Sequence, residues 1–478
     1  MNPLNRWQSL GLIAAGALAA GSTQAAAKIF DVHDFGAKGD GQTLDTEAVQ
    51  KAVDAAAQAG GQVKLRTGMK YLLAPVELKG GIDFHLEGNA EILVSTNPAD
   101  YGAPDSSKNG DSSTGTMASA NLQAVLHASG ADKLTISGTG TINGRSPEFM
   151  DHYDDVGEWW VPKKFRPKLV VLENCKDLTI RDITLKQAPS WTVHLLGCQR
   201  VDIGHISIHN QPDVPNCDGI DPDHCQDVNI HNCHIICGDD AIVIKATKGH
   251  DDLGPSRNIT VRDCVLETQD SGVKIGTETT QDIHDVLFER CTVVNGCRGL
   301  CIQLRDAGSV YNVIFRDITF TSRYFSAPWW GRGEAISFTA IPRAPGAAIG
   351  TIHDILVQNV SGKAENSIRV SGSAESRIRN VTLDNVKVTF DRWTKYPGGV
   401  YDNRPTTAMD GVENHGTAGI SLRHADNIML KNCTVQWGIN VPDYFTHALQ
   451  AEDVTGLKNE GFTGTAAHPG KDAAIVTG

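Results

Sequence analysis

The sequence predicts an all-β protein, a single-stranded right-handed parallel β-helix with an N-terminal capping helix. Short apolar triplets recur at intervals of about 23 to 31 residues through the middle of the chain, and such a period is typical of a solenoid. Asn, Asp and Gly separate the triplets at equivalent places, which favours stacked parallel coils over a sandwich. Leucine-rich repeats are the nearest structural alternative, but their fixed leucine consensus is absent.

Five consecutive triplets define the strands of the repeat, at residues 178–180, 201–203, 228–230, 259–261 and 286–288. Three residues past each triplet, and past later ones, a single column holds Ile183, Ile206, Cys233, Cys264, Cys291, Ile318, Val360, Val386 and Cys433. A position shared by Ile, Val and Cys predicts a core ladder in which free cysteine acts as a small hydrophobe. Cys297 and Cys301 remain possible disulfide partners of each other or of Cys237, and the total of eleven cysteines leaves at least one unpaired.

The ends of a stack of coils expose unpaired backbone and apolar core, so they need covers. The alanine-rich residues 45–56 predict a helix that caps the N-terminal coil. The tail after Gly461 shows no periodic pattern and predicts a poorly determined extension. No composition shift or long linker divides residues 28–478, which we expect to form one domain.

Residues 1–27 predict a cleaved secretory signal. Arg6 precedes an apolar run from Leu10 to Ala20, and small residues occupy positions 25–27 before Lys28. We therefore expect a secreted or periplasmic protein. No later stretch reaches the roughly 18 apolar residues of a membrane helix, so no membrane partner is predicted. A net charge of -13 argues against nucleic acid, because binding phosphate backbones requires a basic face.

Two acidic motifs, Asn216-Cys217-Asp218 and Gly238-Asp239-Asp240, lie about one coil apart, because 22 residues separate Asp218 from Asp240. Three carboxylates are thus predicted to meet on adjacent coils. They cannot all ionise cheaply, so one keeps its proton to higher pH. A protonated carboxyl and an ionised carboxylate are the two groups that hydrolyse a glycosidic bond. Asp221 and Asp223 also lie close, and we assign them to turn formation and to capping of backbone amides.

These motifs resemble glycoside hydrolase family 28, the polygalacturonases and rhamnogalacturonan hydrolases, whose signatures read Asn-x-Asp and Gly-Asp-Asp at this separation. The resemblance extends from residues 35–41 through residues 189–195 to the strands near Cys433. It implies a pectin-lyase-like solenoid as the catalytic domain, acting on pectic, galacturonate-containing polysaccharide or its oligomers. It also implies Asp239 as the general acid, with Asp218 and Asp240 orienting the attacking water in an inverting displacement. The expected partner is an acidic plant cell-wall polysaccharide or oligosaccharide, with no metal or cofactor, and we expect a monomer.

Two further signatures of that family are missing. Where polygalacturonases carry Gly-His-Gly this chain has Asp270-Ser271-Gly272, and where they carry Arg-Ile-Lys it has Cys301-Ile302-Gln303. The resemblance therefore supplies neither the usual histidine partner of the acid nor the usual galacturonate clamp. We expect a pectic substrate other than plain homogalacturonan, with galacturonate on one side of the bond and a neutral sugar such as rhamnose on the other.

Counting along the repeat predicts the rest of the substrate site. Ten residues past three successive triplets stand Asp240, Ser271 and Arg298, which we expect to lie side by side. Strand alternation places further polar residues on the same face. The predicted substrate-binding set is Asn216, Lys245, Ser271, Lys274, Arg298, Gln303 and Arg305. Lys274 and Arg305 are expected to hold a substrate carboxylate; alternatively, these cations pair with Glu278 and Asp306 at the surface and contribute little.

Three segments interrupt the repeat and predict loops, at residues 147–165, 247–257 and 324–334. Two of them carry tryptophan pairs, Trp159-Trp160 and Trp329-Trp330, which either stack on sugar rings or only pin the loops to the helix surface. Two other functions stay open. A β-helical polysaccharide lyase would use the aspartates to bind calcium and a Lys or Arg as base, and a non-catalytic carbohydrate-binding or adhesion solenoid would not need the carboxylate trio.

Overall fold

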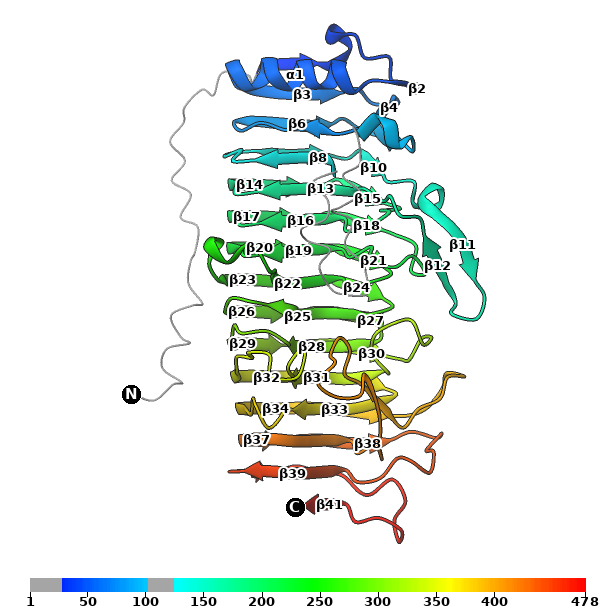
Figure 1. The fold of residues 1–478 in the computed structure, drawn as a ribbon, viewed down its shortest axis with the longest axis vertical. Coiled ribbons are helices and arrows are strands. Elements are labelled where there is room, and N and C mark those ends of the chain that lie inside the picture. Colours follow the sequence, from blue (N-terminus) through cyan, green and yellow to red (C-terminus); the bar gives the residue numbers. More distant parts are fainter. Residues whose placement is uncertain (1–27, 102–123) are drawn as a thin grey trace.

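The computed structural model describes residues 28–101 and 124–478. The predicted signal, residues 1–27, lies outside them. The chain winds into an elongated right-handed parallel β-helix, as expected (Figure 1). Strands at equivalent positions of successive coils pair in parallel, so each coil contributes to three ladders of strands that run the length of the molecule.

The first ladder carries the apolar triplets. Its strands are β1 (Ile29–Asp31), β3 (Gly61–Leu65), β6 (Ile82–Leu86), β9 (Thr135–Gly138), β14 (Lys176–Arg181), β17 (Gln199–Gly204), β20 (Gln226–His231), β23 (Ser256–Arg262), β26 (Ile283–Glu289), β29 (Val310–Arg316), β32 (Ile352–Ala364), β34 (Ile378–Phe390), β37 (Ile420–Lys431) and β40 (Lys458–Glu460).

The second ladder follows the first within each coil. Its strands are β2 (Asp40–Leu44), β4 (Lys70–Leu73), β7 (Glu91–Val94), β10 (Thr141–Asn143), β15 (Thr184–Lys186), β18 (Ser207–His209), β21 (His234–Cys237), β24 (Val265–Thr268), β27 (Thr292–Gly296), β30 (Thr319–Ser322), the second halves of β32 and β34, and β38 (Thr434–Trp437).

The third ladder completes the coil and carries the acidic site. Its strands are β5 (Val76–Glu77), β8 (Ala124–Ser129), β13 (Lys168–Glu173), β16 (Val193–Leu196), β19 (Ile220–Asp223), β22 (Ile242–Ala246), β25 (Ser271–Thr279), β28 (Arg298–Leu304), β31 (Glu334–Ala340), β33 (Asn366–Ser371), the first half of β37, β39 (Leu449–Thr455) and β41 (Ile475–Thr477).

The register of the first ladder matches the sequence alignment. Leu178 pairs with Val201, Val201 with Val228, Val228 with Ile259, and Ile259 with Val286. The predicted column of Ile, Val and Cys residues is buried throughout. All eleven cysteines are free and buried, so none of the possible disulfides among Cys237, Cys297 and Cys301 forms.

A left-handed backbone turn precedes each residue of this buried column. The residues at the turn all have positive φ: Asp182, His205, Asn232, Asp263, Arg290, Asp317, Asn359, Asn385 and Asn432. Asn and Asp tolerate this conformation better than other residues with a side chain. The turn bends the chain from the first ladder into the second and directs the next side chain into the core.

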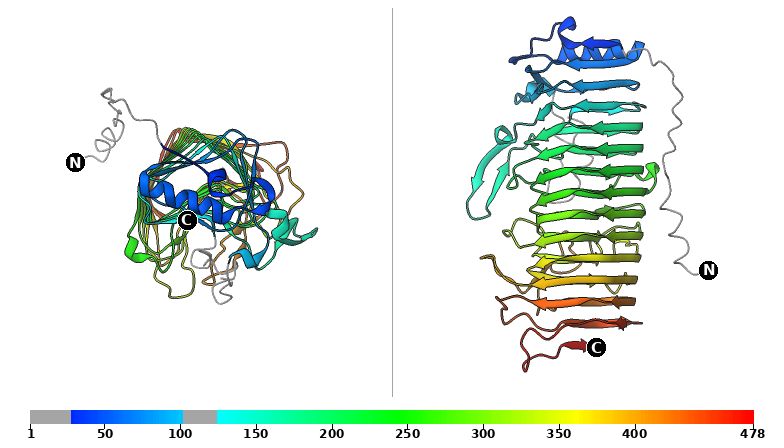
Figure 2. Two further views of the ribbon diagram at one scale, coloured as in Figure 1. Left: turned by 90° about the horizontal axis from the view of Figure 1, so that it is seen from above. Right: turned by 180° about the vertical axis from the view of Figure 1, so that it is seen from behind.

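The N-terminal cap is the helix α1 (Thr46–Ala59), close to the predicted bounds. Its face of Val49, Ala52, Val53 and Ala56 is fully buried, and the end-on view shows the helix lying across the end of the stack (Figure 2). The tail after Gly461 differs from the prediction of a poorly determined extension. Strand β41 pairs in parallel with β39, because the open edge of the last coil offers backbone groups that the tail can satisfy.

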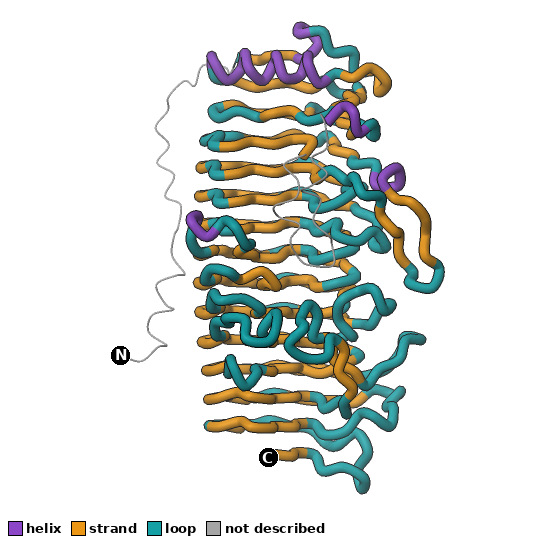
Figure 3. The backbone as a smooth tube through the Cα atoms, in the orientation of Figure 1, coloured by secondary structure: helices purple, strands orange, loops and turns teal. Residues whose placement is uncertain are grey.

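Two small antiparallel hairpins project from the corner between the second and third ladders. They are β11 (Met150–Asp154) with β12 (Trp159–Pro162), and β35 (Val400–Asp402) with β36 (Val412–Asn414). Several short 3-10 turns accompany the loops, η3 (Val32–Phe35), η4 (Pro98–Tyr101), η6 (Ser146–Phe149) and η7 (Asp251–Leu253). The tube view shows that many of the loops leave the stack at one end of the strands (Figure 3). Across residues 28–101 and 124–478, no helix is long and apolar enough to span a membrane.

Candidate active site

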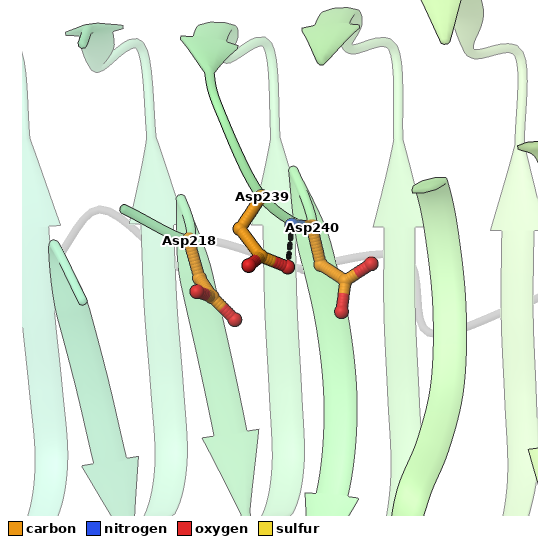
Figure 4. Close-up of side chains that lie close together, drawn as sticks. All are labelled: Asp218, Asp239 and Asp240. Carbon is orange, nitrogen blue, oxygen red and sulfur yellow. Dashed lines mark hydrogen bonds between the residues drawn. The ribbon is translucent and has the colours of Figure 1, made fainter. Parts of the chain in front are cut away.

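The three predicted carboxylates meet at the corner between the second and third ladders. Asp218 precedes β19, and Asp239 and Asp240 join β21 to β22. The Gly219 N–H donates to the Asp240 carbonyl at 2.9 Å, which fixes the two coils in register. One oxygen from each carboxylate lies within 4.8 Å of the others, and all three side chains point the same way (Figure 4).

Glycine allows the two motifs to pass this closely. A Cβ at Gly238 would lie 2.1 Å from the carbonyl oxygen of Val214, and one at Gly219 would lie 2.3 Å from that of Ala241. Both distances are far below a van der Waals contact, so any side chain at either position would push the coils apart. The glycines of the two motifs therefore have a steric function that supports the acidic residues beside them.

Two buried lysines neutralise two of the three aspartates. Lys274 Nζ lies 2.7 Å from Asp240 Oδ2, and Lys245 Nζ lies 3.6 Å from Asp218 Oδ2. Asp239 makes no ion pair within the described part of the chain. Its carboxylate instead accepts backbone N–H groups of Asn216 at 3.2 Å and of Asp240 at 3.0 Å.

Burial and crowding raise the pKa values of this cluster. Burial, followed by the charges of Asp218 and Asp240, raises the pKa of Asp239 to about 7. Burial and the neighbouring Asp221 also raise the pKa of Asp218 well above its ordinary value, against the opposing charge of Lys245. Asp218 and Asp239 therefore both hold a proton to higher pH than an ordinary aspartate does. Because Asp239 has no lysine partner and is only half-buried, it is the member best placed to give a proton to a ligand.

The carboxylates open into a cavity of about 250 Å³. Its lining combines acids, two lysines and aromatic rings: Trp159, Trp191, Pro215, Asn216, Asp218, Asp239, Asp240, Lys245, Asp270, Lys274, Thr277, Glu278, Pro328, Trp329 and Trp330. An apolar wall with a few convergent polar groups is typical of a small-molecule or sugar site. Three of the four loop tryptophans face this cavity, whereas Trp160 packs against Tyr153 with ring centroids 5.3 Å apart.

Three of the predicted substrate-binding residues, Asn216, Lys245 and Lys274, line the cavity. Arg166 holds Asn216 in place, because its Nη2 donates to Asn216 Oδ1 at 2.9 Å. The register of Lys274 beside Cys301 is also as predicted. Counting residues along the coils thus placed Lys245 and Lys274 on the strands that border the cavity.

The structure does not bring Ser271, Arg298, Gln303 and Arg305 to the cavity. Ser271 and Arg298 lie beside Asp240 in register, as expected, but both are fully buried and bind Asp270, at 2.8 Å and 3.2 Å. Residues about 100 positions later in the sequence cover Gln303 and Arg305. Gln303 Nε2 donates to the Arg404 carbonyl at 3.2 Å, and Arg305 Nη2 donates to the Asn403 carbonyl at 3.1 Å. The expectation that Lys274 and Arg305 hold one carboxylate together is therefore wrong for this conformation.

Asp221 and Asp223 do not form turns, in contrast to the prediction, although Asp223 does cap a backbone amide, because its Oδ1 accepts the Thr247 N–H at 2.9 Å. Both lie on β19 with fully buried side chains on the outer face of the third ladder. Asp221 Oδ1 lies 3.5 Å from Lys245 Nζ, and burial raises its pKa to about 7. Asp223 accepts the Thr247 hydroxyl at 2.7 Å. Strand alternation starting from Ile220, which is fully buried in the core, would have indicated this face.

Sequence reasoning also missed the roles of Asp270 and Glu278, which both line the cavity. Burial raises the pKa of Asp270 to about 7, and the charges of Asp240 and Asp239 add to that effect. Burial likewise raises the pKa of Glu278 to about 7, although Lys245 Nζ lies 3.9 Å away. The acidic site is thus larger than the trio. A missing family signature pointed to the position of Asp270 but not to the chemistry of the residue that replaces it.

The spacing of the trio would also suit a cation, because the three oxygens are close enough to share one. Two lysine ammonium groups, however, already lie 2.7 Å and 3.6 Å from these carboxylates. Their charge opposes the entry of calcium, since like charges repel strongly in a buried site. The geometry favours acid–base chemistry over the metal-assisted proton abstraction of a lyase.

Comparison with known proteins supports this interpretation. The family model of glycosyl hydrolases family 28 matches residues 61–397, which include the whole site. A probable polygalacturonase from Vitis vinifera is 27% identical over 384 residues, which cover 74% of this chain and 73% of that protein. The structure of the family 28 exopolygalacturonase from Yersinia enterocolitica aligns with a TM-score of 0.67 at 18% identity, covering 92% of this chain and 79% of that one. The hyperthermoactive exopolygalacturonase from Thermotoga maritima aligns with a TM-score of 0.64 at 20% identity, covering 84% and 92%. The two structures share the fold.

The raised pKa of Asp239 predicts how activity depends on pH. A general acid must be protonated, and the protonated fraction of Asp239 falls as pH rises through about 7. We expect kcat/KM to decline on the alkaline side with an apparent pKa near 7. Because the charge of Lys274 lowers the pKa of Asp239, Lys274→Met should move this decline to higher pH. A pH profile of both proteins tests this, and a decline that begins near the ordinary pKa of an aspartate would contradict it.

Proposed function

The chain belongs to glycosyl hydrolases family 28, and from its site we propose that it hydrolyses pectic, galacturonate-containing polysaccharide or its oligomers. The observation that carries this proposal is a half-buried aspartate without an ion pair, Asp239, between two aspartates that lysines neutralise. Such a set supplies a proton donor and two bases at one point. The match to this family favours hydrolysis over the two alternative functions, a polysaccharide lyase and a non-catalytic adhesion protein.

In the proposed mechanism Asp239 donates its proton to the glycosidic oxygen. Asp218 and Asp240 orient a water molecule, and one of them takes up a proton from it as the water oxygen bonds to the anomeric carbon and the bond from that carbon to the protonated glycosidic oxygen breaks. Lys274 forms an ion pair with Asp240 at 2.7 Å, and the charge of Lys245 opposes the rise in the pKa of Asp218 that burial and Asp221 cause. The aromatic rings of Trp159, Trp191 and Trp330 line the cavity and can pack against the sugar faces.

The proposed mechanism inverts the configuration at the anomeric carbon, although the spacing of the three carboxylates does not by itself favour inversion. Carboxyl pairs in inverting enzymes are typically about 6.5–9.5 Å apart, whereas oxygens of this trio lie within 4.8 Å. We still propose inversion, because the ion pairs of Asp218 and Asp240 with lysines weaken both carboxylates as nucleophiles. NMR of the first product distinguishes the two courses, and a product that keeps the anomeric configuration of the substrate would contradict inversion.

The trio gives a direct mutational prediction. Asp239→Asn should lower kcat by about 10²–10⁴-fold while substrate binding and fold are kept, because it removes a general acid. Asp218→Asn and Asp240→Asn should be comparably damaging. The matched control is Asp252→Asn, since Asp252 is an exposed aspartate on a loop outside the cavity. Release of reducing ends from pectic fractions is the assay, and near-normal turnover of Asp239→Asn would show that another residue is the acid.

The substrate proposal follows from the cations that the cavity has and lacks. Cys301 and Gln303 are buried and carry no charge, so they cannot replace an Arg-Ile-Lys clamp. Lys245 and Lys274 are the only lysines or arginines among the described residues that line the cavity. We therefore propose galacturonate on one side of the cut bond and a neutral sugar such as rhamnose on the other. Faster cleavage of homogalacturonan than of every rhamnose-containing fraction would contradict this.

The variant Lys274→Met tests two proposed functions of Lys274, binding of a substrate carboxylate and the ion pair with Asp240. Because Lys274 also binds Asp240 at 2.7 Å, kcat should fall on every substrate. The KM for acidic oligomers should rise as well, and that rise should shrink at high salt, because screening weakens the lost attraction. Lys387→Met is the control, since Lys387 is exposed on β34 outside the cavity. An unchanged KM on an acidic oligomer would remove Lys274 from substrate binding.

We also propose that the enzyme is exported and acts as a monomer. Residues 1–27 read as a secretory signal, and N-terminal sequencing of exported protein should begin near Lys28. An active species with the mass of one chain in solution would support the monomer, and activity confined to a larger species would oppose it.

A further inference from the structure

The outer face of the third ladder runs along the molecule beside the trio, and we call this face the floor of the groove. Lys245 on β22 and Lys274 on β25 face outward and line the cavity. On the next strands, outward-facing residues follow the same alternation but are buried away from the cavity: Gln303 and Arg305 at the end of β28, Ser337 on β31 and Arg369 on β33. Arg298 and Arg305 are among the largest fully buried side chains of the described residues. Something therefore covers the floor one coil beyond Lys274.

The cover is the β35–β36 hairpin together with Asn403 and Arg404. Arg369 Nη2 donates to Asn403 Oδ1 at 2.7 Å, and its guanidinium lies 4.2 Å from the ring centroid of Tyr401. Asn366 Nδ2 donates to the Val400 carbonyl at 2.9 Å. With the contacts of Gln303 and Arg305 described above, the hairpin is bonded to β33 and to the end of β28.

The hairpin is also tied to the wall of the cavity. Asp402, which is 1% exposed, forms ion pairs with Arg332 at 2.9 Å and with Arg404 at 2.6 Å. It accepts the Gly331 N–H at 2.9 Å. Arg404 Nη2 donates to the Trp329 carbonyl at 2.7 Å. Because Trp329 and Trp330 line the cavity, the hairpin and the tryptophan loop form one connected barrier beside the site.

We propose that this barrier closes the groove on the side of the later coils, so that the enzyme accepts chain ends and releases products of fixed size. A polymer bound in mid-chain must continue across the floor on both sides of the trio. Here the floor beyond β25 is occupied by chain that makes buried hydrogen bonds and ion pairs, which are costly to break one partner at a time. This inference rests on the proposed hydrolysis, but it concerns only where along a chain the cut is made.

The test uses the full enzyme on a pectic polymer and on uronic-acid oligomers of defined length. We expect one product size from the first minutes, and a slow fall of viscosity relative to the reducing ends released. A mixture of product sizes with an early collapse of viscosity would overturn the proposal. Absence of reducing ends from every pectic fraction would instead count against the hydrolytic function, so the two failures are distinguishable.

A variant of the hairpin tests the cause. Replacing residues 403–411 by Gly-Gly leaves the two strands joined by a two-residue turn and removes the groups that cover Gln303, Arg305 and Arg369. Intermediate product sizes should appear, and the fall of viscosity per bond cut should rise several-fold. Arg404→Ala, which removes only the ties to Asp402 and Trp329, provides a second variant should the first not fold, and should change the product pattern in the same direction.

The control for both variants is Arg290→Ala, because Arg290 pairs with Asp263 on the distant first-ladder side and should leave the product pattern unchanged. Thermal melting verifies the fold of each protein. If a folded hairpin variant keeps the single product size of the wild type, the hairpin is not the barrier and the proposal is wrong.

Discussion

The left-handed turn that ends each first-ladder strand is the constraint on which the rest of the structure depends. It occurs at Asn, Asp, His or Arg in coil after coil, and each time it sends the following Ile, Val or Cys into the core. Because a residue of the buried column follows each of these turns directly, the chain passes from the first ladder to the second at the same point of successive coils, even where the coils differ in length. Extra residues can then leave only as loops, and strands of successive coils stay in register.

That register creates the acidic site without any long-range recognition. Asp218 and Asp240 meet because 22 residues make one short coil, and Lys274 reaches Asp240 because it lies in the next coil on the outer face. The resulting cluster of buried carboxylates would be unstable alone, since each needs a counter-charge or a proton. Lys245 and Lys274 supply counter-charges for Asp218 and Asp240, and Asp239, which has no ion pair among the described residues, has its pKa raised to about 7. The same arrangement that stabilises the cluster therefore makes Asp239 different from its two neighbours, as the proposed mechanism requires.

The sequence predicted those features that a local count can determine. The triplet ladder, the cysteine column, the capping helix, the trio and the positions of Lys245 and Lys274 all follow from periodicity within consecutive coils. Arg298 and Gln303 lie on one strand, β28, and Arg305 directly follows it, in the order that counting predicts. Their burial was not predicted, because Asn403 and Arg404 cover two of them from about 100 residues away. Contacts between a loop and a distant coil leave no periodic pattern. Asp221 was missed for a different reason, since a turn assignment was preferred over strand alternation.

The outer face of the third ladder shows why this fold serves varied functions. Its strands continue with the same alternation from β19 to β33, so the ladder alone does not mark where a ligand binds. Loops from the corner beside it decide that: the tryptophan loops frame the open part, and the β35–β36 hairpin covers the rest with hydrogen bonds to Arg305 and Arg369. The coils thus position the catalytic groups, while the loops determine how much of the floor a ligand can reach. Loops can change length without disturbing the register of the coils. The part of the floor that a ligand can contact can therefore vary without any change in the catalytic groups.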